Sequence, residues 1–144
     1  MAQSKMERQM QTFKDWVKVN NGHDVAGIMK YVADDIELSS SMRQEAHNKK
    51  EAAEFWESLF KTFPDIKVEP YSYTCDGNTI FVESFMQGTM KGKMGDVEPT
   101  NKTWRIRAAF RFDFNEDAKI SKLCSFYDRC SIMLHLYHKL GEQS

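Results

Sequence analysis

The sequence predicts an α+β fold in which a cone-shaped, curved antiparallel sheet wraps around helices from the N-terminal half of the chain. Apolar residues recur at helical spacing in that half, whereas further along they alternate with polar residues, as in strands with one buried face. The order helix, helix, strand, helix and then long strands places the helices on one face of a sheet, with a cavity at the open end. At 144 residues, the chain is expected to form a single domain over 1–144.

Three helices are expected in the N-terminal half. The first ends near residues 20–22, where two asparagines and a glycine suit a left-handed cap. Asp24 is expected to cap a short second helix, and Asn48 and Glu51 have the capping-box spacing that opens a third. The apolar face of the first helix consists of Met6, Met10, Phe13 and Val17.

Four long strands are expected to follow in meander order, and the segment 103–114 has the most regular alternation. Asp76-Gly77 is a hairpin signal between the first two strands. Earlier in the chain, a brief strand at 35–39 is expected to lead into a polar loop at 40–47, and a last helix runs from about Ile132 to Leu140. The long strands cover residues 66–74, 79–90, 103–114 and 119–128.

Composition excludes several kinds of partner. The 20 Lys and Arg residues are balanced by 21 Asp and Glu, which leaves no basic excess to bind a nucleic-acid backbone. No apolar run reaches the length of a membrane span and the N-terminal residues are polar, so we expect a cytoplasmic protein that binds no membrane.

Three widely spaced cysteines indicate neither a disulfide framework nor a zinc site. The apolar residues are bulky, with 10 Phe, 9 Met, 5 Tyr and 3 Trp.

Four stretches of the sequence resemble one protein family. They are GHDVAGIMKYVADDIEL from Gly22, NKKEAAEFWESLFKTFPDIKVE from Asn48, GTMKGKMGDVEPTNKTWRIRAAFRF from Gly88 and KISKLCSFYDRCSIMLHLYHKLG from Lys119. In this order they resemble the SnoaL-like polyketide cyclases of the nuclear transport factor 2-like superfamily. The resemblance implies a cystatin-like roll with a deep apolar pocket, no metal or cofactor, and a homodimer through the outer face of the sheet. Family members range from cyclases and isomerases to proteins without a known reaction, so the fold does not determine the function.

Asp128 is the first candidate for a catalytic residue. By strand parity it shares a face with Ile120, Cys124 and Phe126, and desolvation on such a mostly apolar face would favour the protonated carboxyl and suit proton transfer. The resemblance implies the same role, since the acid/base aspartate of SnoaL-like cyclases stands at a similar position. The alternative is that Asp128 caps the helix beginning near Arg129, and the two roles are compatible.

Other polar residues are weaker candidates. His47, in the loop before the capping box, could act as a base at the rim of a pocket, although a loop histidine is commonly only solvated. Asp34 and Asp35 would point to opposite sides of a strand, so that one could face the pocket mouth. His135 and His138 are close on one helix, but no third ligand is near them in the sequence, and no metal site is predicted.

The polar face of segment 103–114 carries Arg105, Arg107 and Arg111 beside Asp113. Salt bridges or a polar dimer interface would account for them, and an anion site is the alternative. Arg111 and Asp113 have the Arg-x-Asp spacing of limonene-type epoxide hydrolases in this superfamily, but they lie on the face that we expect to point outward.

Large apolar residues are the expected walls of the pocket. A curved sheet leaves space that such side chains line without filling, and methionine adapts to varied apolar ligands. Packing in an ordinary core is the alternative. The expected lining residues are the aromatic and methionine residues Trp16, Tyr31, Trp56, Phe60, Met86, Met90, Met94, Trp104, Phe110 and Phe126, together with the charged Asp35.

Two functions remain open from the sequence. One is a cofactor-free cyclase or isomerase that binds a small apolar carbonyl compound in the cone and uses Asp128 as its acid/base, assisted by His47. The other is a non-catalytic module that binds a hydrophobic ligand or dimerises. Both are compatible with the SnoaL-like resemblance.

Overall fold

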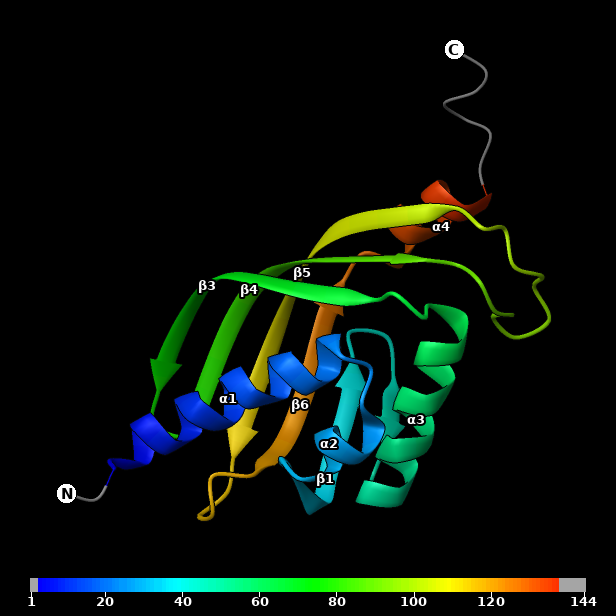
Figure 1. The fold of residues 1–144 in the computed structure, drawn as a ribbon. Coiled ribbons are helices and arrows are strands. Elements are labelled where there is room, and N and C mark those ends of the chain that lie inside the picture. The colour runs from blue at the N-terminus through cyan, green and yellow to red at the C-terminus, as the bar shows by residue number, and fades with distance from the viewer. Residues whose placement is uncertain (1–2, 138–144) are drawn as a thin grey trace.

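The computed structural model describes residues 3–137 of the chain and confirms the predicted α+β fold. Six strands form one curved sheet in the order β2-β1-β6-β5-β4-β3, with α1 running across one face (Figure 1). The end of the predicted last helix, including His138 and Leu140, lies outside the described residues. The elements are α1 (Lys5–Asn21), α2 (Val25–Met29), β1 (Val32–Ser40), β2 (Gln44–Ala46), α3 (Lys49–Thr62), β3 (Lys67–Asp76), β4 (Thr79–Thr89), β5 (Thr103–Phe114), β6 (Ile120–Tyr127) and α4 (Arg129–Tyr137).

The long strands β3, β4, β5 and β6 form the predicted antiparallel meander. β1 extends this meander in parallel with β6, so the sheet is mixed rather than wholly antiparallel. The segment 40–47, expected to be a loop, contains the short strand β2 paired with β1. The polar sequence of β2 carries no strand pattern, and its conformation comes from pairing in the folded chain.

Strand β5 forms the centre of the core. Its residues alternate between buried and less buried positions along the whole strand, as predicted. Helix α1 packs on the buried face, where Phe13 and Trp16 meet the ring of Phe112 edge-on at centroid distances of 5.2 and 5.0 Å. Burial of one such side chain contributes about 1.5 to 3 kcal/mol to stability. The buried face of β5 consists of Trp104, Ile106, Ala108, Phe110, Phe112 and Phe114.

The predicted caps at the starts of α2 and α3 are confirmed. Asp24 accepts a hydrogen bond from the Gly27 N–H, and Asn48 accepts one from the Glu51 N–H, each at 2.9 Å. Glu51 in turn accepts from the backbone N–H of His47 at 2.8 Å. The bonds from Gly27 and Glu51 satisfy N–H groups that the first turn of a helix leaves without partners, and the bond from His47 satisfies the N–H of the residue before the Asn48 cap.

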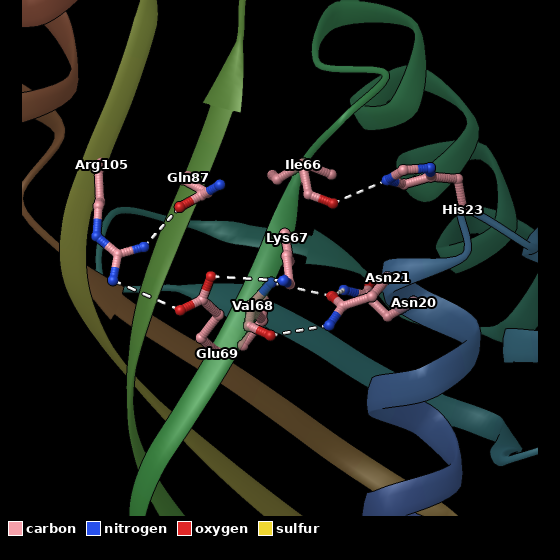
Figure 2. A network of polar contacts seen from close by, with 9 residues as sticks. All are labelled: Asn20, Asn21, His23, Ile66, Lys67, Val68, Glu69, Gln87 and Arg105. Carbon is pink, nitrogen blue, oxygen red and sulfur yellow. Dashed lines mark hydrogen bonds and ion pairs between the residues drawn. The ribbon is translucent and has the colours of Figure 1, made fainter.

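A polar network joins the end of α1 to the edge strand β3 (Figure 2). The Asn21 side chain donates to the carbonyl of Val68 and accepts from its N–H, both at 2.9 Å. His23, rather than residues 20–22, takes the left-handed conformation, with φ 56°, and its ring Nε2 lies 2.8 Å from the carbonyl of Ile66. Because no strand among residues 3–137 pairs with the outer side of β3, these side chains satisfy backbone groups that would otherwise need water.

Removal of the Asn21 amide is expected to destabilise this junction. Asn21→Ala leaves the N–H and carbonyl of Val68 without their side-chain partners, which should lower the free energy of unfolding by about 1 to 3 kcal/mol. Asn21→Asp keeps the acceptor only and should lie between Asn21→Ala and the wild type. Denaturant unfolding followed by circular dichroism measures both. The control is Gln11→Ala, which removes an exposed bond to Asp15 on the same helix; if Asn21→Ala destabilises no more than this control, the junction contributes nothing.

Candidate functional site

A cavity with two adjoining compartments opens among the sheet, α3 and α4. The outer compartment, named the vestibule here, has a volume of about 520 Å³, and the inner compartment, named the chamber, about 120 Å³. Small-molecule sites commonly measure about 300 to 1,000 Å³. Residues that line both compartments form a neck between them: Ser40, Glu45, Phe55, Leu59, Phe63, Tyr127 and Ile132.

The chamber has mostly apolar walls. Of the residues expected to line a pocket, Trp16, Met86, Trp104 and Phe110 lie here, and all are buried. Met94 lines the vestibule. The chamber is completed by other apolar residues and a few small polar ones, which the sequence analysis did not select: Asn20, Leu38, Ser39, Ile66, Val68, Leu123 and Ser125.

Several expected lining residues pack elsewhere. Trp56 and Met90 are buried in the core, and Tyr31 and Phe60 are half-buried against it. Asp35 is exposed on β1, because Ile36 and Leu38 take the buried positions of that strand. The prediction that Asp35 faces the pocket is therefore wrong.

A bulge in β6 reverses the faces expected for the end of that strand. Phe114 pairs with Ile120, but Asp113 pairs with Lys122, so Ser121 is an extra residue. One extra residue moves every later side chain to the opposite face. Phe126 consequently lies on the outer side, 41% exposed, and lines neither the chamber nor the vestibule, contrary to the prediction that it would line the pocket.

Asp128 is displaced by the same bulge. Asp128 is exposed, whereas the prediction placed it on a mostly apolar face. It lines neither the chamber nor the vestibule. Its carboxylate accepts hydrogen bonds from the N–H of Cys130 and the hydroxyl of Ser131, both at 2.9 Å. The capping alternative is confirmed.

His47 is also exposed and lines neither compartment of this cavity. Its backbone N–H takes part in the capping box described above. Asp34, the neighbour of Asp35, pairs with Lys49 at 3.6 Å on the surface. None of these residues brings an ionisable side chain to the cavity.

Two ionisable residues at the neck were missed by the sequence analysis. Glu45 on β2 has only 16% of its side chain exposed and accepts a bond from Arg43 Nε at 3.2 Å. Tyr127 on β6 is half-buried, and burial, together with the nearby Glu45 carboxylate, raises the pKa of its phenol against the opposing effects of Arg129 and Arg43. The phenol is therefore a protonated hydrogen-bond donor at neutral pH.

The sequence signals for these two residues differ. Ile120 and Leu123 are apolar and three positions apart in an otherwise alternating segment, which indicates a bulge and hence the inward position of Tyr127. Glu45 has no such signal, because it belongs to a strand that only tertiary pairing creates.

The arginines of β5 lie on the outer face, as predicted. Arg105 approaches Glu69 at 3.5 Å and lies over the ring of Phe85, 4.3 Å from its centroid. Arg111 pairs with Asp113 at 3.2 Å, so the Arg-x-Asp pair is engaged away from the cavity. Within residues 3–137, no three His, Cys, Asp or Glu side chains are grouped to hold a metal ion. No helix in that range has the length and apolarity needed to cross a membrane.

Comparison with known protein families identifies the family to which the chain belongs. A family model described as a SnoaL-like domain matches residues 13–123. The chain belongs to the SnoaL-like domain family. Among curated proteins, none matches it.

Solved structures share the fold of this SnoaL-like domain. A candidate polyketide cyclase from Xanthomonas campestris pv. campestris has a TM-score of 0.85 and 12% identity, covering 93% of this chain and 100% of its own. A candidate SnoaL-like polyketide cyclase from Jannaschia sp. CCS1 has a TM-score of 0.82 and 16% identity, covering 94% and 96%. AclR, a candidate hydroxylase from Streptomyces galilaeus, has a TM-score of 0.77 and 20% identity, covering 96% and 83%. At these identities the likeness concerns the fold alone.

The capping role of Asp128 in this SnoaL-like domain is testable by two substitutions. Asn caps helices as well as Asp does, so Asp128→Asn should leave stability within about 0.5 kcal/mol of the wild type, whereas Asp128→Ala should lower it by about 1 kcal/mol. Thermal and denaturant unfolding measure both. Equal stability of Asp128→Ala and wild type would contradict the capping role.

Proposed function

We propose that this SnoaL-like domain binds a small, largely apolar molecule that occupies the chamber and extends into the vestibule. One observation carries the proposal: the mostly apolar chamber connects to the vestibule through a neck that holds few polar groups. Such a combination is typical of small-molecule sites, where apolar walls supply affinity and a few polar groups fix orientation. The structural relatives described as polyketide cyclases support it by analogy.

A side chain that blocks the neck should abolish this binding. Leu59 on α3 lines both compartments, so the larger ring of Leu59→Trp is expected to obstruct the passage between them. The neutral dye 1-N-phenylnaphthylamine, whose fluorescence rises in apolar surroundings, provides the measurement. We expect its Kd to rise at least about tenfold, as for the loss of one well-packed contact.

The matched control is Leu134→Trp, the same substitution at an exposed leucine of α4 outside the cavity lining. It should leave the Kd of the dye unchanged. If the wild type does not bind the dye, or if Leu59→Trp binds it as the wild type does, the proposed site is wrong.

A second candidate function is proton transfer at the neck, and the shared position of Glu45 and Tyr127 favours it. The Glu45 carboxylate would remove a proton from the carbon next to a ligand carbonyl, and the electron pair would move to the carbonyl oxygen. The protonated Tyr127 phenol would donate a hydrogen bond to that enolate oxygen. Where the enolate is conjugated with a carbon–carbon double bond, return of the proton from Glu45 to the far carbon of that dienolate completes an isomerisation. Attack of the enolate carbon on a second carbonyl forms an alkoxide, and transfer of the Glu45 proton to that alkoxide completes an aldol cyclisation. This assignment replaces Asp128, which is outside the cavity.

Acetophenone in D₂O tests this chemistry, because its ring is small enough for the chamber while its methyl ketone would lie at the neck. NMR follows loss of the methyl proton signal. We expect the wild type to accelerate the exchange of the methyl protons for deuterium. Glu45→Gln should lower that acceleration at least about a hundredfold, because it removes the general base. Tyr127→Phe should lower it about tenfold or more, because it removes the hydrogen-bond donor to the enolate oxygen. Asp128→Asn should match the wild type. Full activity in Glu45→Gln would exclude the mechanism.

We also propose that two copies associate through the outer face of the sheet. Phe81 and Phe126, 42% and 41% exposed, lie on adjacent parts of that face with ring centroids 6.3 Å apart, and Tyr71 packs beside Phe85. Exposed aromatic clusters of this kind are common at interfaces. Sedimentation equilibrium should show a dimer for the wild type and a monomer for the double substitution Phe81→Glu and Phe126→Glu. Leu134→Glu, on α4, should stay dimeric, and a monomeric wild type would contradict the proposal.

A further inference from the structure

We infer that Met94 determines which ligands the vestibule accepts, and that Gly92 and Thr62 are positioning residues that hold Met94 in place. The inference rests on the proposed ligand-binding function, because it concerns the part of the ligand that lies in the vestibule. It identifies that part as an apolar chain attached to the ring in the chamber. Met94 belongs to the segment 91–99 between β4 and β5, named the strap here.

The strap is joined to the sheet at its base and closed at its tip. Met90 donates its N–H to the carbonyl of Lys102 at 3.0 Å and accepts from the N–H of Asn101 at 2.9 Å, so β4 and β5 remain joined where the strap leaves them. At the tip, Met94 and Val97 exchange two backbone hydrogen bonds at 3.1 and 3.0 Å. In Figure 1 the strap projects beyond the sheet and lies beside the end of α3.

Three hydrogen bonds attach the strap to the C-terminal end of α3. The carbonyl of Thr62 accepts from the N–H of Lys91 at 2.9 Å and from that of Gly92 at 3.1 Å. The Thr62 hydroxyl donates to the carbonyl of Lys93 at 3.0 Å, which is shorter than its 3.3 Å contact with the carbonyl of Ser58. A helix leaves its last carbonyl groups without internal partners, so the strap supplies the bonds that the Thr62 carbonyl needs.

Glycine at position 92 allows the strap to approach α3 this closely. A Cβ added to Gly92 would lie 2.8 Å from the carbonyl carbon of Lys61 and closer still to its oxygen. Both atoms belong to the backbone, so they cannot turn aside as the end of a flexible side chain would. Any larger residue at position 92 would therefore move the strap away from α3.

Met94 borders the vestibule where the vestibule meets the neck. It is half-buried against the core and lines the vestibule together with Leu59 and Phe63. Leu59 and Phe63 also line the chamber, so they belong to the neck. Thr62, which holds the strap, lies between them on the last turn of α3. A ligand that leaves the chamber through the neck therefore reaches the strap.

The chemistry of this end of the vestibule narrows the ligand. Glu51 and Glu54, the charged residues that α3 contributes to the vestibule, lie about 12 Å or more from Thr62 along the helix axis. The strap end is lined by Leu59, Phe63 and Met94, which favour an apolar chain, and methionine adapts to chains of different shape. The ligand class is therefore a ring that carries an apolar chain of several carbons.

Acetophenone and hexanophenone are matched probes, because they share the ring and the carbonyl and differ only by four methylene groups in the chain. The short probe ends at the neck, whereas the chain of the long probe extends into the vestibule. Displacement of 1-N-phenylnaphthylamine, whose own Kd is measured for each protein, gives the Kd of both ketones. We expect the wild type to bind hexanophenone at least about tenfold more tightly than acetophenone, because the added chain leaves water.

Substitutions at the strap should reduce this preference for the long probe. Met94→Ala removes the contact with the chain and should lower the preference at least about threefold. Gly92→Ala displaces the strap and Thr62→Val removes the hydroxyl, so each should have the same effect although Met94 is intact. Thr62→Ser keeps the hydroxyl and should keep the preference. Because the ratio of the two Kd values is taken within one protein, a general loss of stability does not change it.

Two control substitutions match these changes. Met10→Ala shortens a half-buried methionine of α1 that lines neither compartment. Gly22→Ala adds a methyl group at a position where the nearest atom beyond the chain neighbours is 3.4 Å away. Both variants should keep the preference of the wild type.

The outcomes separate the inference from the function on which it rests. If the dye binds but Met94→Ala keeps the wild-type preference, or if the wild type binds both ketones equally, the role of Met94 is wrong while cavity binding stands. A preference unchanged in Thr62→Val, or lost equally in Thr62→Ser, overturns the positioning role; if Gly92→Ala fails to fold, this pair of Thr62 variants decides. Failure of the dye to bind the wild type overturns both the inference and the proposed function.

Discussion

The one-sided burial of β5 is the constraint on which the rest of the structure depends. Its alternating large residues present an apolar surface that must be covered, and α1 covers part of it through Phe13 and Trp16. The bonds from Asn21 and His23 to the edge strand fix where that helix ends. What α1 leaves uncovered, between α3, α4 and the beginning of β5, becomes the chamber. The cavity thus follows from how far one helix reaches across one strand.

The bulge at Ser121 then decides which side chains meet the cavity. Without the extra residue, Phe126 and Asp128 would continue the inward face of β6; with it, Tyr127 faces inward and Asp128 is free to cap α4. The parallel pairing of β1 with β6 brings β2, and with it Glu45, to the same neck. A change of one residue in register therefore brings the half-buried phenol of Tyr127 to the neck beside the Glu45 carboxylate and leaves the Asp128 carboxylate exposed.

The fold could be predicted from the sequence because its signals are local. The caps at Asp24 and Asn48 and the period of two along β5 depend on neighbours in the chain, and each was found where expected. The first helix also formed, but its buried residues are Gln9, Phe13, Trp16 and Asn20, whereas Met6, Met10 and Val17 are only half-buried. The chamber residues Trp16, Met86, Trp104 and Phe110 could be predicted because buried faces of helices and strands converge inside a cone. The polar residues Glu45 and Tyr127 could not, because their positions depend on a register shift and on β2, whose conformation arises from non-local pairing.

The central claim of this account is that the chamber and the vestibule together bind a small, largely apolar molecule. The crystal structure of the protein with bound 1-tetralone measures it most directly. The account predicts density for the rings of the ketone inside the chamber or at its neck, against apolar walls that include Trp16 and Trp104. Density for the ketone only on the outer face of the sheet, with none in the chamber or the vestibule, would contradict the account.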